Sequence, residues 1–534
     1  MAAPDQLHVE MSFGDTLLDT YGREILDTYG RNILDLGWVD IQEDVITETP
    51  ITIFQGQRGG SPLDRVADSG TIKFVLNNND SNSGGVMGYY SPDSLNKRGG
   101  FEIGARVRVG LTKSAVTEWL SQGRVIDIKP AAGLLENKLV DVTCGDWIET
   151  ASRTPMPRLP IQQSVTDDQV IQTIVNNMDD APAATDLEVG AYTYPYALTD
   201  VEDEETRVLT VLQSLAQSGL GRIFITGGAT SGEVLRYVDL YSLLTIGTPV
   251  AAFNDAFLNL EALRRAYKRV KRVVATAYPM AKDASPVVLY SLTNEIALAA
   301  GAEAEFVGFY RDPNANSSAS IAAVDVVTPV VNTDYKFSSV SGSGTDMNAS
   351  LEIVAFTAGA KSFKTRVRNN GAVTGYLWFY QTRGKGLYPY DTISHVAVDT
   401  TIKENEGATL TYDLPYQAGY TITKEIAEAM LDWYSAEATD VPSFEYLPSA
   451  SEADFTKFLA CKPGTLITVS EGVTNIAYTM ILLGREINIW NGGAYISERL
   501  FVTPAQMVES ALYFTLDTLG QDDLDGDNTI LAFG

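Results

Sequence analysis

The feature that most constrains the fold is a set of short β-type segments that occurs near the start of the chain and again near its end. The first copy reads GARVRV (104–109), GRVIDI (123–128) and LVDV (139–142), and the second reads GTLITV (464–469), GREINI (484–489) and LFVT (500–503). The third segment follows the glycine of the second by 16 residues in both copies, from 123 to 139 and from 484 to 500. Glycine followed by a Val/Ile strand is common in β proteins, but three matched segments in order favour duplication over coincidence. A duplication predicts two related β-barrels in one chain.

The second segment of each copy matches residue by residue, with Val125 against Glu486 as the mismatch in type. The matched pairs are Gly123 and Gly484, Arg124 and Arg485, Ile126 and Ile487, and Ile128 and Ile489. Because alternate residues of a strand share one face, we expect the isoleucines to point into their barrels, with Asp127 and Asn488 turned the opposite way.

Length and composition place these copies in a larger chain. At 534 residues the chain is too long for one compact core, and its 45% hydrophobic and 20% charged residues are typical of folded protein. We therefore expect a mainly β, multidomain fold that is α+β overall. The expected regions are an N-terminal arm (1–35), a first β-barrel (36–149), an α+β domain (150–284), an inserted β-sandwich (285–412), and a helix with the second β-barrel (413–534).

Three segments carry helical periodicity. Residues 165–178 begin with Thr166 as a cap, and their apolar residues recur on one helical face. Residues 206–219 repeat this pattern and end at Gly219, and residues 422–436 carry one apolar stripe. The first two helices and the strand-like RIFIT and GEVLRYVDL after them predict an α+β middle region.

Residues 19–34 repeat an octapeptide, DTYGREIL and then DTYGRNIL. Two copies are too few for a solenoid, which needs about three stacked units. A local duplication within the N-terminal arm is the favoured interpretation. The alternative is an arm that becomes ordered only against a neighbouring subunit.

Longer stretches of the chain resemble a known protein family. The stretches are GWVDIQEDVITETPITIFQGQRGGSPLDRVADSGTIKFVLNNND (37–80), SPDSLNKRGGFEIGARVRV (91–109), FYRDPNAN (309–316), SGSGTDMNASLEIVAF (341–356), RVRNNGAVTGYLWFYQTRGKGL (366–387), GATLTYDLPYQAGYTITKEIAEAML (407–431) and the last residues, 512–534. The first two are similar to the N-terminal domain of tail-tip, or baseplate hub, and minor tail proteins of long-tailed bacteriophages. The next four resemble the sandwich inserted late in that family, and the last resembles its final hairpin.

The resemblance implies a structural hub of the tail tip, a homotrimer on the tail axis whose subunits each supply two tail-tube-like barrels. Three subunits would present six barrels to a six-fold tube, close its distal end, adapt it to a three-fold tip and open for DNA ejection. The implied partners are the tail tube or distal tail protein ring, the tape-measure protein, further tip or receptor-binding proteins, and viral DNA in passage. The implied location is the distal end of the virion tail, after synthesis in the host cytoplasm.

Charge and cysteine content exclude several other classes of protein. The net charge of −29, from 39 basic and 68 acidic residues, argues against a protein that binds nucleic acid or anionic membranes in general, because like charges repel. Cys144 and Cys461 lie more than 300 positions apart, which predicts two buried thiols rather than a disulfide framework. The first ten residues carry no signal-peptide pattern, and no stretch approaches the roughly 18 apolar residues of a membrane span.

Catalytic motifs are weak, and we expect no enzyme activity and no cofactor. His8 lies in the expected arm and His395 in an alternating, strand-like segment, so a nucleophile would lack a well-placed base. GGATSG (227–232) has Glu233 where a phosphate loop carries lysine, and we expect a turn between strands.

Acidic clusters have plain structural explanations. EDEE (202–205) precedes a predicted helix, whose N-terminus favours negative charge. DDLDGDN (522–528) resembles a calcium loop but has Ala532 where the loop needs glutamate, so we expect an acidic turn and no metal.

One segment departs from the acidic balance: RRAYKRVKR (264–272) holds 6 of the 39 basic residues. These are Arg264, Arg265, Lys268, Arg269, Lys271 and Arg272. Two interpretations stay open, a solvated face that balances nearby acids, and a surface that docks an acidic partner subunit, DNA or the tape-measure protein.

Two rival functions also stay open. A receptor- or carbohydrate-binding tail protein would use the 285–412 sandwich, and exposure of its aromatic side chains would favour this reading while burial would favour the hub. These aromatic residues are Tyr376, Trp378, Phe379 and Tyr380. A tail-associated cell-wall hydrolase is the other rival, and turnover of purified peptidoglycan would establish it.

Overall fold

The structure, a computed structural model, is mainly β and consists of several sheets with few helices, which confirms the predicted fold class. It describes residues 4–13, 15–16, 34–35, 37–59, 63–133, 137–201, 205–255, 257–263, 269–315, 319–404, 406–435 and 440–505. The octapeptide repeat up to residue 33 and the DDLDGDN segment lie outside these residues. Residues 15–16 and 34–35 form two short paired strands, β2 (Asp15–Thr16) and β3 (Leu34–Asp35).

The first β region forms one half of a large sheet, and we call its strands the first β-unit. They are β1 (Gln6–Ser12), β4 (Trp38–Asp40), β5 (Ile51–Gly56), β6 (Thr71–Asn77), β7 (Arg106–Lys113), β8 (Val116–Pro130) and β9 (Leu139–Gly145), with a short 3-10 helix, η1 (Gln42–Asp44). Their order is β4-β1-β7-β8-β9-β6-β5. β1 pairs with β7 along its whole length and buries Val9 and Met11. The prediction that the first 35 residues form an arm is therefore wrong for Gln6–Ser12, because alternating apolar residues anchor this strand in the core.

The last β region forms the other half of the sheet, the second β-unit. Its strands are β15 (Ala251–Asn254), β16 (Asn259–Leu263), β30 (Asp440–Tyr446), β31 (Leu466–Glu471), β32 (Ile476–Trp490) and β33 (Tyr495–Pro504), with α6 (Glu452–Ala460), η4 (Pro448–Ala450) and η5 (Asn491–Gly493) between them. Each unit contains an antiparallel meander, β7-β8-β9 or β31-β32-β33, whose middle strand has 15 residues. Segments that match in sequence thus take equivalent places. The pairings among described residues follow an open path, and closure of either unit into a barrel stays a prediction.

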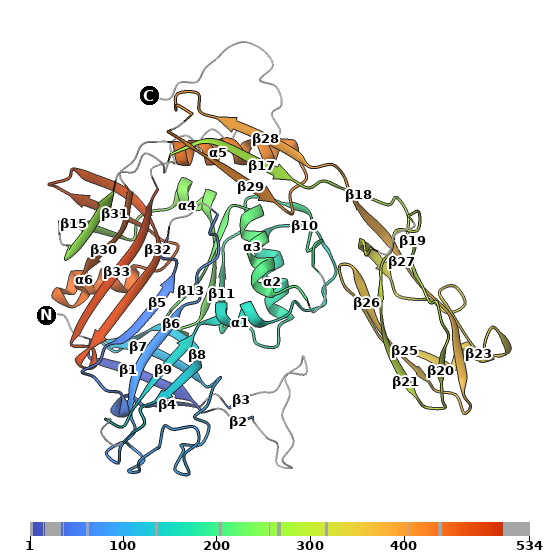
Figure 1. Cartoon of the computed structure of the whole chain (residues 1–534), viewed down its shortest axis with the longest axis horizontal. Coiled ribbons are helices and arrows are strands. Elements are labelled where there is room, and N and C mark those ends of the chain that lie inside the picture. Colours follow the sequence, from blue (N-terminus) through green and yellow to red (C-terminus); the bar gives the residue numbers. More distant parts are fainter. Residues whose placement is uncertain are drawn as a thin grey trace.

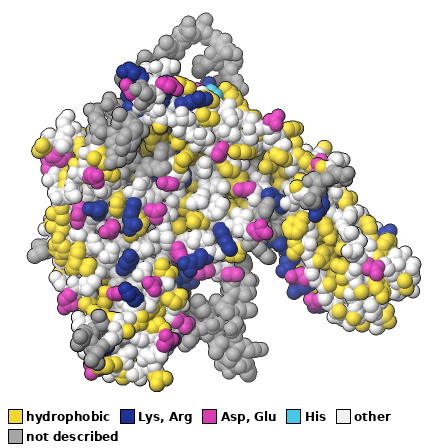
Figure 2. All heavy atoms as spheres, viewed as in Figure 1, with side chains coloured by type: hydrophobic (Ala, Val, Ile, Leu, Met, Phe, Trp, Pro, Cys, Tyr) yellow, Lys and Arg dark blue, Asp and Glu magenta, His cyan; other side chains and the backbone are white. Residues whose placement is uncertain are grey.

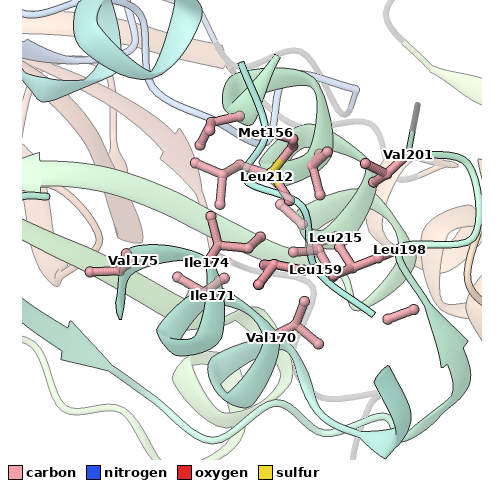
Figure 3. Close-up of a cluster of buried hydrophobic side chains, with 14 of the residues drawn as sticks. Met156, Leu159, Val170, Ile171, Ile174, Val175, Leu198, Val201, Leu212 and Leu215 are labelled. Atoms are coloured by element: carbon pink, nitrogen blue, oxygen red, sulfur yellow. The ribbon is translucent and has the colours of Figure 1, made fainter. Parts of the chain in front are cut away.

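The middle region is α+β, as predicted. It holds α1 (Trp147–Arg153), β10 (Gln162–Val165), α2 (Asp167–Asn176), β11 (Ala184–Leu187), β12 (Tyr194–Ala197), α3 (Val208–Ser218), β13 (Gly221–Thr226), β14 (Val234–Asp239) and α4 (Leu240–Ile246). The predicted helices are α2, which begins after Thr166, and α3, which ends before Gly219. Their apolar faces meet in one core, where Ile171 and Ile174 cluster with Leu212 (Figure 3). GGATSG is the predicted turn, between β13 and β14.

A small three-stranded sheet packs against α3 of the middle region. It consists of β17 (Val270–Ala277), flanked by β28 (Ile393–Val398) and β29 (Ala408–Leu414), and it packs against α5 (Tyr420–Ser435). α5 is the third predicted helix, and it buries Ile426, Met430 and Trp433. β28 and most of β29 fall inside the predicted sandwich range, yet both strands pair with β17, which lies outside it. The strand pairing therefore removes β28 and β29 from the sandwich, so its residue range is shorter than predicted.

The sandwich itself projects from the body of the molecule (Figure 1). One sheet has the order β21-β26-β25, and in the other the long β27 pairs with five further strands. The strands are β18 (Met280–Lys282), β19 (Val287–Ser291), β20 (Ile296–Leu298), β21 (Glu303–Phe309), β22 (Ala322–Val327), β23 (Tyr335–Val340), β24 (Ser343–Asp346), β25 (Leu351–Ala358), β26 (Ser362–Asn369) and β27 (Gly375–Pro389), with η3 (Asn348–Ser350). Phe363 and Tyr380 stack between the sheets at 5.9 Å.

Candidate functional site: the seam between the two β-units

The two β-units join where β5 of the first pairs with β32 of the second, and we call this contact the seam. The strands are antiparallel, with Gly56 opposite Gly484 and Ile51 opposite Ile489. The seam makes one continuous sheet from segments more than 400 residues apart in the chain. The first unit is thereby held directly against the second.

Two glycines let the strands approach at one end of the seam. A Cβ atom on Gly484 would lie 2.6 Å from the carbonyl oxygen of Gln57, and one on Gly56 would lie 2.2 Å from that of Leu483. Gly56 also has a φ of +86°, which disfavours side chains. Gly123, the counterpart of Gly484, is closed in the same way, since its Cβ would meet the carbonyl oxygen of Gly145 at 2.5 Å. The matched glycines are therefore positions of close backbone approach in both units.

Arg485 fastens the seam from within the protein. Its side chain is 2% exposed, and its Nε donates to Gln55 Oε1 at 2.9 Å while Nη1 donates to the carbonyl oxygen of Cys461 at 2.8 Å. Gln55 in turn donates from Nε2 to the carbonyl oxygen of Leu120 in β8. One guanidinium thus connects β32, β5 and the end of α6.

A buried carboxylic acid accompanies this arginine. Glu498 Oε1 lies 3.7 Å from Arg485 Nη1, and Tyr446 donates its hydroxyl to Glu498 Oε2 at 2.6 Å. Burial raises the pKa of Glu498 to about 7, although Arg485 and Tyr446 act in the opposite direction. Arg485 of the seam therefore has beside it, on β33, a carboxyl group whose pKa is near neutral pH.

The isoleucine expectation is confirmed in one unit and only partly met in the other. Ile487 and Ile489 are 0% and 2% exposed and belong to the same core as Ile51 and Ile53 of β5. Ile128 is half-buried against that core, and Ile126 is half-buried outside it. The reason is a bulge in β8 between Val125 and Asp127, which turns Val125 into the core instead. Asp127 is exposed, as predicted, and Asn488 is half-buried.

Arg124, the counterpart of Arg485, fastens the first unit to the middle region. Its Nη1 donates to Glu233 Oε1 at 2.8 Å, and its Nη2 donates to Asp180, which also binds Arg106. Glu233 is fully buried, and burial raises the pKa of its carboxyl. Sequence reasoning missed this role of Glu233; the matched Gly-Arg pair was the signal that marked its partner.

The basic run falls partly outside the described residues, since Arg264, Arg265 and Lys268 are among those not described. Of the others, Arg269 donates from Nε to the carbonyl oxygen of Ser435 at 3.0 Å, and Lys271 forms an ion pair with Glu404. Arg272 is exposed on β17. Two of the three described cations therefore have internal partners. Across the body in Figure 2, basic and acidic side chains are interspersed.

The other titratable candidates occupy structural positions. His8 lies in β1, not in an arm, and its Nε2 is 2.7 Å from Thr112 Oγ1. His395 lies in β28, as its alternating segment predicts, with Nδ1 3.2 Å from the Tyr420 hydroxyl. Both cysteines are buried and unpaired, as predicted. Within the described ranges, no three His, Cys, Asp or Glu residues gather as metal ligands, and no helix is long and apolar enough to cross a membrane.

No family model and no curated protein matches the chain. Similar solved structures include the tail protein of Neisseria meningitidis MC58 (TM-score 0.45, 10% identity, 93% of this chain and 96% of that one). Another is the 43 kDa tail protein of prophage MuSo2 from Shewanella oneidensis (TM-score 0.46, 8% identity, 94% of this chain and 99% of that one). A third is a prophage tail protein from Listeria monocytogenes (TM-score 0.41, 6% identity, 96% of this chain and 99% of that one). All three are tail proteins.

These tail proteins are similar to the chain in overall shape alone. Each alignment covers more than nine tenths of both chains, but the TM-scores stay below 0.5 and the identities at or below 10%. The likeness to tail proteins therefore assigns no role to any residue.

The four aromatic residues that would support a binding role for the sandwich differ in burial. Tyr380 is 1% exposed and lies in the sandwich core, whereas Tyr376, Trp378 and Phe379 are half-buried. Trp378 borders an open recess of about 320 Å³. The recess is also lined by Asn332, Lys336, Phe337, Ser338, Gly342, Ser343, Gly344, Asp346 and Asn348.

Proposed function

We propose that this chain is the structural hub of a bacteriophage tail tip, as its sequence resemblance implies. The observation that carries the proposal is the seam, where two units with the same meander join edge to edge in one sheet of 13 strands. A chain built in this way offers two similar blocks side by side. Three copies would offer six blocks, which matches a six-fold tail tube.

In this role the hub closes the distal end of the tube, adapts six-fold to three-fold symmetry and opens for DNA ejection. The net charge of −29 suits the last step, because DNA slides past acidic or neutral surfaces without being held. In this role the chain is structural and catalyses no reaction. The buried polar groups at the seam bind each other and hold the two β-units together. Its place is the distal end of the virion tail.

The proposed partners are the tail tube or distal tail protein ring above the hub, the tape-measure protein, and further tip or receptor-binding proteins. The basic run is the proposed docking surface for an acidic partner. Support comes from Arg272, which is exposed on β17 beside the paired Lys271.

Electron cryo-microscopy of purified tails tests the proposal through the copy number and symmetry at the tail axis. We expect three copies below a six-fold ring, with the six β-units arranged around one channel. Six copies, or a single copy in the virion, would refute the hub assignment.

The recess beside Trp378 favours a second candidate function for the sandwich, carbohydrate binding. The indole of Trp378, which has Lys336 Nζ 5.6 Å from its ring centroid, borders the recess together with Asn332 and Asp346, and such a mixture of aromatic and polar groups suits a sugar ring and its hydroxyls. Binding of neutral mono- and disaccharides to the full chain, followed by calorimetry, tests it. Trp378→Ala should abolish binding while Tyr420→Ala, at an exposed tyrosine outside the sandwich, keeps it; absence of binding by the unchanged chain would exclude this function.

A further inference from the structure

The two β-units differ by one missing strand neighbour. In the first unit β5 pairs with β6 on one edge and with β32 on the other. By its place in the order β32-β33-β30-β16, the counterpart of β5 in the second unit is β16. Within the described part of the chain β16 pairs with β30 alone, so its outer edge lacks the neighbour that β5 has.

A complementary gap lies on β8, the counterpart of β32. The second half of β32 has β33 on one edge and β5 on the other. One edge of β8 is covered by β7 and by the residues that precede β7. This cover ends at Val125, whose backbone N–H donates to the carbonyl oxygen of Ala105. From Ile126 to Pro130, the described strands provide β9 as a partner on one edge and none on the other.

Burial differs between the two strands in the same way. Ile487 and Ile489 are fully buried where β5 runs beside β32, whereas Ile126 and Ile128 are half-buried where no described strand runs beside β8. A strand laid along this edge of β8 would cover the half-buried isoleucines. The bulge in β8 explains why Val125 turns inward, but it leaves the open edge unexplained.

We infer that β16 of one copy pairs antiparallel with residues 126–130 of the next copy, so that three copies close into a ring. The inference rests on the proposed function, because it takes the partner to be a second copy in a trimer. In this contact β16 and β8 of neighbouring copies pair as β5 and β32 pair within one chain. Each open edge is five residues long, 259–263 on one side and 126–130 on the other.

Charge selects a register for this contact. Glu261 and Lys129 are both exposed, carry opposite charges and lie near the middle of the two open edges. When they stand opposite each other in an antiparallel pair, Ala262 stands opposite Ile128. This register therefore pairs the opposite charges and covers an isoleucine at the same time.

Paired cysteines test the contact on the full chain and on assembled tails. In the double variant Glu261→Cys with Lys129→Cys, mild oxidation should link copies into a covalent trimer, because each copy supplies one cysteine to each neighbour. Both positions are exposed, so folding is preserved, and the native cysteines are buried. Glu261→Cys with Lys403→Cys, an exposed lysine elsewhere, is the matched control and should give no linked trimer.

Two further pairs, Glu261→Cys with Asp127→Cys or Ile128→Cys, cover a register slip. A three-copy mass without linkage by any of the three pairs would overturn the strand contact and leave the hub proposal standing. A mass other than three copies on the tail axis would overturn both.

Discussion

At the scale of single residues, Glu498 makes the stability of the seam depend on pH. Its folded-state pKa, raised to about 7 by burial, lies above the ordinary value of 4.5. Its contribution to stability is therefore fully present below about pH 4.5 and is lost as the pH rises through about 7. Protonated Glu498 is the form that the buried site accepts.

We expect Glu498→Gln to remove this pH dependence, since the amide cannot ionise. The difference in Tm between the variant and the unchanged chain should move in favour of the variant as the pH rises from about 4.5 to about 8. A constant difference for Glu498→Gln would show that its carboxyl titrates in the same way folded and unfolded.

The glycines of the seam should tolerate no side chain. Gly484→Ala forces a methyl group against backbone oxygens of the neighbouring strand, so we expect a loss of about 1–3 kcal/mol in the free energy of unfolding. Gly99→Ala is the matched control, because its Cβ meets no atom within 4 Å, and should stay within about 0.5 kcal/mol. Urea unfolding at one pH measures the free energy of unfolding of both variants. Equal losses would mean that the strands of the seam can move apart to accept a methyl group at position 484.

How far the sequence predicted these residues depended on whether the signal was local. The Gly-Arg match pointed to Arg124 and Arg485, because duplication leaves a visible record in the sequence. Their partners could not be found that way. Gln55 and Glu233 become partners only when strands distant in the chain meet, and no local pattern encodes that meeting.

At the scale of elements, β8 and β32 have the same length but different neighbours, so equivalent truncations should differ. Ile489→Ala removes a fully buried side chain and should cost about 2–5 kcal/mol of unfolding free energy. Ile128→Ala should cost the single chain clearly less, because Ile128 is already half-exposed. Chemical unfolding of dilute protein separates the two variants.

Both truncations should nevertheless damage assembly. Loss of Ile489 weakens the seam within a copy, and loss of Ile128 weakens the proposed contact between copies. Copy number in assembled tails, measured for each variant, checks this expectation. Normal assembly of Ile128→Ala would count against the contact between copies.

Long elements with a clear period were predicted well, and short ones were not. α2, α3 and α5 have several turns, which display an apolar face in the sequence. α1 and α6 were missed because helices of seven and nine residues show too few periods to stand out. β1 was missed because its residues were attributed to an arm, although VEM alternates as a strand does.

At the scale of the whole molecule, the ends of the sandwich decide which deletion the fold tolerates. Replacing residues 281–388 by an Asn-Gly turn joins β18 to the paired end of β27, where Met280 lies opposite Pro389. We expect the rest of the chain to keep a cooperative unfolding transition. Deleting 285–412, the range expected from the sequence, should abolish or broaden it, because β28 and β29 are lost from β17 and α5 is uncovered.

Calorimetry of the two deletion variants measures the difference, with the unchanged chain as reference. Equal behaviour would mean that the β17 sheet adds nothing to the stability of the body. The sequence predicted sandwich strands up to residue 412, but β28 and β29 pair with β17 instead, because their composition is the same as that of sandwich strands. Which sheet a strand joins is decided by tertiary pairing.

The seam also sets the timing of folding. Gln55 and Arg485 are 430 positions apart, so β5 leaves the ribosome long before β32 exists. Contacts of such sequence separation form late, after the local meanders have folded. During synthesis the first β-unit therefore has an unpaired edge on β5 until translation has passed β32. A chain whose synthesis stops before β32 therefore lacks the seam altogether.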